Sequence, residues 1–110
     1  MLKSVLKDLN PIIKGELMRA QFHNGKTFHS PHEGYAVIKE EMEECSEALV
    51  KTWNVFNDVW EAIRDDREVP GDKMWDMKRC AEETAAEAVQ VVAMCHKFMI
   101  SKYEWEADDE

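Results

Sequence analysis

Apolar residues recur along most of this chain at steps of three and four, the spacing that places side chains on one face of an α-helix. One such stripe lies within residues 31–64 and has a seven-residue period interrupted only by a threonine. A second stripe of the same kind lies within residues 77–98. The first stripe comprises Ile38, Met42, Cys45, Leu49, Thr52, Phe56, Val59 and Ile63, and the second comprises Met77, Ala81, Thr84, Ala88, Val91, Cys95 and Phe98. The pattern predicts an all-α fold with long helices.

Capping and turn residues set the predicted helix boundaries. The Asn10-Pro11 pair indicates that a short opening helix gives way to a second one, which ends at Asn24-Gly25. The Ser30-Pro31-His32-Glu33 motif is a capping box with proline at the first helical position, so a long helix should begin at Pro31. With the last helix, these boundaries predict a bundle of about four helices.

The helix over residues 31–64 is long for a small domain. Without a break it measures about 50 Å at 1.5 Å per residue, against a diameter of about 34 Å for a compact chain of this length. Either it breaks near residues 51–54, or it extends into a partner subunit of a homodimer or homotetramer. The second possibility also covers the apolar area of Trp53, Trp60 and Trp75.

Residues 65–71 form a polar connection, and Asp72 can cap the last helix. That helix should end near Tyr103, and the acidic segment 104–110 should be a frayed tail. Nothing else in residues 1–110 marks a boundary, so a single domain is expected.

The composition narrows the classes of function. A net charge of −9 disfavours binding to nucleic acid or to an anionic membrane, and no stretch reaches membrane-spanning length. Cys45, Cys80 and Cys95 form no Cys-x-x-Cys pair and fall among apolar helical positions, so they are expected to be buried free thiols. A reducing cytoplasm is the expected location.

Candidate chemistry lies in the acidic run from Glu40 to Glu47. Acid runs on helices are usually solvated faces, but helical geometry separates these residues into two groups. Glu40, Glu43 and Glu47 point away from the apolar stripe, whereas Glu41 and Glu44 lie one turn apart on its flank. Two carboxylates that border a core are costly unless a cation or a hydrogen-bond donor compensates them.

The last helix repeats this arrangement, because Glu83, Glu87 and Gln90 share one flank of its stripe. Two helices can therefore offer oxygen ligands to a common point. Oxygen ligands without neighbouring cysteine or histidine ligands favour Mg²⁺, with Mn²⁺ as a substitute. The predicted metal ligands are Glu41, Glu44, Glu83, Glu87 and Gln90.

These motifs resemble those of the all-α nucleoside triphosphate pyrophosphohydrolases, the MazG-like family. The family mark is Glu-Glu-x-x-Glu on one helix, matched by Glu40-Glu41-Met42-Glu43-Glu44, and Glu-x-x-Asp on a later one. Glu87-Ala88-Val89-Gln90 matches the second motif except that Gln90 replaces the aspartate, and Glu83 could supply the missing charge. The segment from Phe28 to Tyr35 resembles a phage- or prophage-type branch of the family.

The resemblance implies a Mg²⁺-dependent enzyme that cleaves the α–β phosphate bond of a nucleoside triphosphate to give a nucleoside monophosphate and pyrophosphate. Glu41, Glu44 and Glu87 would be the catalytic metal ligands. The amide at position 90 leaves an alternative open, namely a non-enzymatic helical homo-oligomer that keeps the fold and binds a partner.

Overall fold

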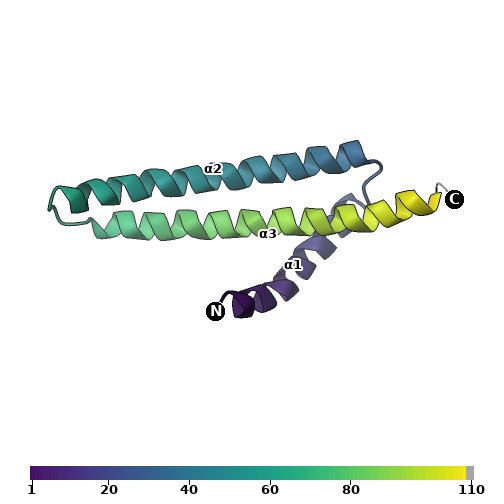
Figure 1. Ribbon diagram of the computed structural model, residues 1–110, viewed down its shortest axis with the longest axis horizontal. Helices are drawn as coiled ribbons and strands as arrows, with labels where there is room; N and C mark the ends of the chain where they lie inside the picture. The colour runs from purple at the N-terminus through teal and green to yellow at the C-terminus, as the bar shows by residue number, and fades with distance from the viewer. Residues whose placement is uncertain (109–110) are drawn as a thin grey trace. The chain divides into compact units, whose positions relative to one another are not determined.

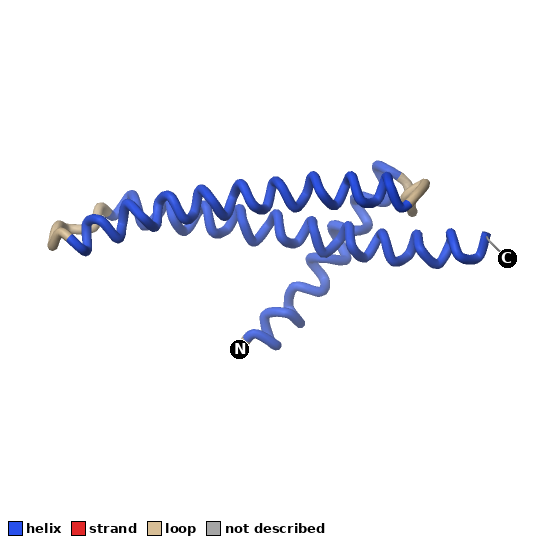
Figure 2. Tube along the Cα trace, turned by 45° about the horizontal axis from the view of Figure 1, so that its top comes forward, coloured by secondary structure: helices blue, strands red, loops and turns tan. Residues whose placement is uncertain are grey.

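The computed structural model describes residues 1–108, and these residues form three α-helices and no strand. The helices are α1 (Leu2–Asn24), α2 (Pro31–Arg64) and α3 (Gly71–Asp108), joined by two short loops (Figures 1 and 2). The all-α prediction is confirmed. The described chain has three helices where the sequence predicted about four.

The predicted break at Asn10-Pro11 is wrong, because α1 runs through Pro11 without interruption. Leu6, Leu9, Ile13 and Leu17 continue one stripe past this point, whereas exposed Pro11 lies on the opposite side of the helix. Water can then bind the carbonyl group that the proline leaves without a helical partner. The apolar stripe therefore outweighs the proline as a boundary signal.

The chain divides into two compact units. The first unit comprises Met1–Glu41 and the chain from Val89 onward, and the second comprises Met42–Ala88. The core of the first unit is formed by α1, the loop that follows it and α3. Its buried members are Leu17, Phe28, Ala93 and Met94.

Two hydrogen bonds hold the loop between α1 and α2 against α3. The backbone N–H of Phe28 donates to Ser101 Oγ at 2.8 Å, and Trp105 Nε1 donates to the carbonyl of Phe28 at 3.1 Å. Trp105 also packs edge-on against Phe98. The prediction of a frayed tail from residue 104 is therefore wrong for residues 104–108, which continue α3, while residues 109–110 lie outside the described part.

The start of α2 has the predicted capping contacts. The backbone N–H of Glu33 donates to Ser30 Oγ at 3.1 Å. The Glu33 carboxylate reaches back to the backbone N–H of His29 at 3.4 Å and to its ring Nδ1 at 2.8 Å. The side-chain hydrogen bond from His29 lowers the pKa of Glu33, which stays ionised near the positive end of the helix dipole.

The second unit is a hairpin of the later part of α2 and the first part of α3. Small and β-branched side chains of α2 are buried where the two helices meet: Ala48, Val59 and Ala62. Thr52 Oγ1 and Thr84 Oγ1 lie 3.3 Å apart at the same contact. Neither alternative for residues 51–54 needs a break, since α2 is continuous there.

The turn between α2 and α3 follows the predicted polar connection. The backbone N–H of Arg67 donates to the carbonyl of Ala62 at 2.8 Å, and Asp66 adopts a φ of 53°. Aspartate is among the few non-glycine residues that enter this region readily. Helix α3 begins at Gly71, so Asp72 lies in its first turn and is not the capping residue.

The three cysteines are free thiols as predicted, but their predicted burial is wrong. Cys45 and Cys80 are half-buried, and Cys95 is exposed. Among the described helices, none combines the length and the apolar character that crossing a membrane requires.

Two glycine substitutions should have opposite effects on stability. A Cβ atom at Gly34 would lie 2.6 Å from Cδ2 of Phe98, whereas one at Gly15 meets no atom within 4 Å. We expect Gly34→Ala to lower the free energy of unfolding by about 1–3 kcal/mol through overpacking. Gly15→Ala should raise it by about 0.5–1 kcal/mol because alanine favours the helix. Urea unfolding of both variants measures this, and equal shifts would contradict the packing around Gly34.

Candidate metal centre

Glu44 of α2 and Glu87 of α3 interact across the hairpin. Partial dehydration of the Glu44 carboxyl raises its pKa, and the charge of Glu87 raises it further. A hydrogen bond with Glu87 and the charge of Glu47 act in the same direction. Two acids from different helices therefore compete to be ionised at one place.

Glu41 lies one turn before Glu44 on the continuous helix α2. One carboxylate oxygen from each of Glu41, Glu44 and Glu87 can be chosen so that all three lie within 4.8 Å of one another. We call these three residues the carboxylate cluster. The structure thus brings together the three acids that the sequence analysis predicted as catalytic ligands.

A hollow of about 250 Å³ in the hairpin extends this acidic region. Glu83, predicted to supply extra charge, lines it together with Glu44 and Glu87. Exposed Glu47 also lines the hollow, although it is not part of the carboxylate cluster. Four acids around one hollow create a strongly negative surface that favours cations.

Lys51 lines the same hollow and was not among the predicted site residues. It is the one cationic residue among those that line it. The sequence held a usable signal, because Lys51 follows Glu44 by seven residues and therefore lies two turns along the same flank of α2. An ammonium group at this position can bind a phosphate oxygen once the acids are neutralised.

Gln90 has a different environment from the carboxylate cluster. Its Nε2 donates to Glu16 Oε2 of α1 at 2.6 Å, and Arg19 forms an ion pair with the same carboxylate at 2.9 Å. Glu16 was not predicted as a partner, because it is 74 residues away and no local pattern links the two. The amide nitrogen of Gln90 is therefore engaged in packing α1 on α3.

The donor set of the carboxylate cluster fits a hard divalent cation. Three carboxylates supply oxygen atoms only, which suits Mg²⁺ or Mn²⁺ better than Zn²⁺. Mg²⁺ requires six oxygen ligands and usually retains several waters. Three protein carboxylates would therefore leave positions for water and for phosphate oxygens of a substrate.

Comparisons with known proteins give no match: no family model fits the chain, and neither the curated proteins nor the solved structures include a similar one. The argument for a function therefore rests on the motifs and on the geometry of the carboxylate cluster.

The contact between Gln90 and Glu16 can be tested by restoring the carboxylate that the motif would have. We expect Gln90→Glu to lower the free energy of unfolding by about 1–2 kcal/mol, because a charge-assisted hydrogen bond becomes a repulsion between two acids. The double variant Gln90→Glu with Glu16→Gln should recover most of this loss. Thermal unfolding measures all three proteins, and a double variant no more stable than the single one would contradict the contact.

Proposed function

We propose that this protein is a Mg²⁺-dependent nucleoside triphosphate pyrophosphohydrolase that cleaves the α–β phosphate bond. The observation that carries the proposal is the pairing of Glu44 with Glu87 across the hairpin, which raises the pKa of Glu44. Perturbed acids that share one site are a common feature of catalytic centres. The motif resemblance supplies the reaction class.

In this proposal Glu41, Glu44 and Glu87 hold the cation, and Glu83 adds negative charge beside them. A bound Mg²⁺ would neutralise phosphate charge and lower the pKa of an attacking water. Lys51 would bind a phosphate oxygen at the edge of the hollow. Gln90 keeps α1 in place through Glu16, and its oxygen is at most a weak additional ligand.

The charge of the whole chain supports a cation-dependent reaction. A protein with a net charge of −9 repels a free triphosphate, and bridging cations remove that repulsion. The proposed setting is the cytoplasm, where the three free thiols would remain reduced.

Replacing Glu44 should separate stability from metal binding. The raised pKa means that the folded state holds a proton which the unfolded state releases earlier, so this contribution to stability is lost as the pH rises through the raised pKa. Without metal, Glu44→Gln should therefore unfold at a higher temperature than the parent at neutral pH. Adding Mg²⁺ should stabilise the parent and have little effect on the variant.

Scanning calorimetry at acidic and neutral pH, with and without Mg²⁺, tests this. Glu40→Gln is the matched control, since Glu40 is exposed and lies outside the hollow. If Glu44→Gln and Glu40→Gln behave alike, the acidic region is a solvated surface and not a site.

Turnover should depend on which acid is removed. Glu41→Gln should lower the rate of pyrophosphate release by at least about 100-fold, because the cation contributes several kcal/mol of charge stabilisation in the transition state. Glu47→Gln should retain most of the activity, since Glu47 is outside the carboxylate cluster. A screen of nucleoside triphosphates for pyrophosphate release provides the assay, and Mn²⁺ titration measures binding in each variant.

A second candidate function is a non-enzymatic helical protein that retains the fold and binds a partner. The observation that favours it is the use of Gln90 for packing on Glu16 at a position where the motif has an aspartate. This candidate predicts no pyrophosphate release from any nucleoside triphosphate and no stabilisation by Mg²⁺ or Mn²⁺.

A further inference from the structure

One face of the hairpin formed by residues 42–88 is apolar and uncovered. Five large side chains of α2 on this face are between 41% and 56% exposed: Leu49, Trp53, Phe56, Trp60 and Ile63. Helix α3 adds Met74, which is 47% exposed, and the small exposed residues Ala81 and Ala88. We call these eight residues the seam face. Contiguous exposed apolar surface of this kind usually marks an interface.

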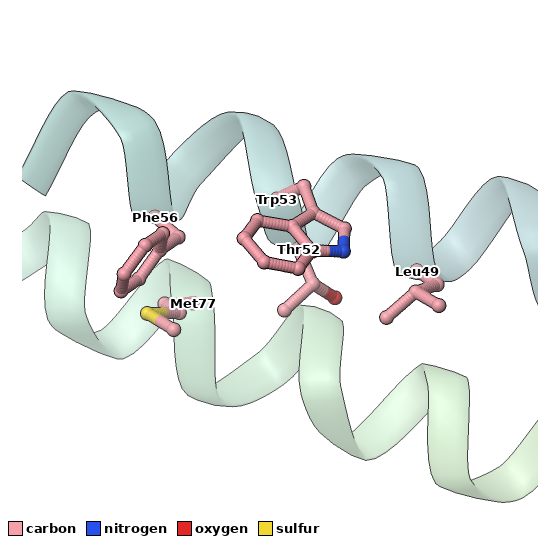
Figure 3. Close-up of a pocket in the computed structure, with 5 residues that line it drawn as sticks. All are labelled: Leu49, Thr52, Trp53, Phe56 and Met77. Carbon is pink, nitrogen blue, oxygen red and sulfur yellow. The ribbon is translucent and has the colours of Figure 1, made fainter.

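The seam face contains an open pocket of about 280 Å³, lined by Leu49, Thr52, Trp53, Phe56 and Met77 (Figure 3). Phe56 and Met77 project from the two facing helices, and Trp53 lies at its edge. Thr52 is the one polar lining residue. The volume is slightly below the range of about 300–1,000 Å³ for pockets that bind small molecules. Such a pocket suits the insertion of large apolar side chains.

The heptad pattern of α2 shows that the hairpin uses only half of its stripe. Cys45, Thr52 and Val59 are covered by α3: the thiol of Cys45 lies 3.7 Å from the carbonyl of Thr84, Thr52 contacts the Thr84 hydroxyl, and Val59 is buried. The alternate stripe positions Leu49, Phe56 and Ile63 remain about half exposed. In helical bundles both sets of positions are buried, because each helix packs against more than one neighbour.

We propose that the seam face is the interface between two copies of this chain, whose hairpins pair to form a four-helix bundle. The stripe from Met42 to Ile63 carries no charged residue, so two chains of net charge −9 can meet there without opposing their acids. On α2 the seam face and the acidic hollow lie on opposite sides of buried Ala48. Pairing would therefore leave the hollow open.

The exposed area favours a second copy over a short peptide. The chain exposes 8384 Å². A folded monomer of 12.8 kDa is expected to expose about 6,300 Å². The surplus of roughly 2,100 Å² per chain matches the share of one subunit in an obligate homodimer interface.

Analytical ultracentrifugation of the full chain tests the proposal without any substitution. We expect a species of twice the 12.8 kDa chain mass at micromolar concentration, both with and without Mg²⁺. A monomer under these conditions would overturn the proposal. The result does not depend on catalysis, so failure of the proposed enzymatic function would leave it standing.

A pair of tryptophan substitutions locates the interface. Trp53→Glu places a charge in the seam face and should weaken dimerisation by at least about 30-fold, the loss typical of a central aromatic residue. Trp75→Glu is the control, because Trp75 is 69% exposed on α3 but points away from Met77, nearly half a turn round the helix. Circular dichroism checks that both variants remain helical. Equal dissociation constants for the two variants would assign the interface to another face.

Discussion

The packing of α2 against α3 at Ala48, Val59 and Ala62 is the contact on which both surfaces of the hairpin depend. Small side chains let the two helices approach closely, and this fixes which neighbouring positions face each flank. Glu44 and Glu87 then meet on one side, while Leu49 and Phe56 are left on the other. The acidic hollow and the seam face are two consequences of one helix contact.

Much of the fold was accessible from the sequence because helical geometry is local. The capping box at Ser30 and the continuous stripe of α2 depend only on neighbouring residues, and both were predicted correctly. The two errors have a common cause. Pro11 and the acidic segment after residue 103 were interpreted by local propensity alone, but the stripe through Leu17 and the packing of Trp105 decide the structure there.

The same distinction applies to the candidate metal centre. The one-turn spacing of Glu41 and Glu44 follows from the helix, and facing alone predicted that Glu87 would point toward them. Lys51 could have been found by extending the same flank by two turns. The bond from Gln90 to Glu16 could not, since it depends on where α1 packs and joins residues 74 positions apart.

Gln90 bears on how the acidic hollow is balanced. An aspartate at this position would place a carboxylate against Glu16, whose oxygen lies 2.6 Å from the amide nitrogen. That repulsion would act on the contact that holds α1, whereas an amide donates a hydrogen bond there. Glu83 lies one turn before Glu87 and lines the hollow, so it can restore the negative charge without affecting α1. The exchange of aspartate for glutamine is therefore compatible with a functional cation site, because packing of α1 and charge in the hollow are served by different residues.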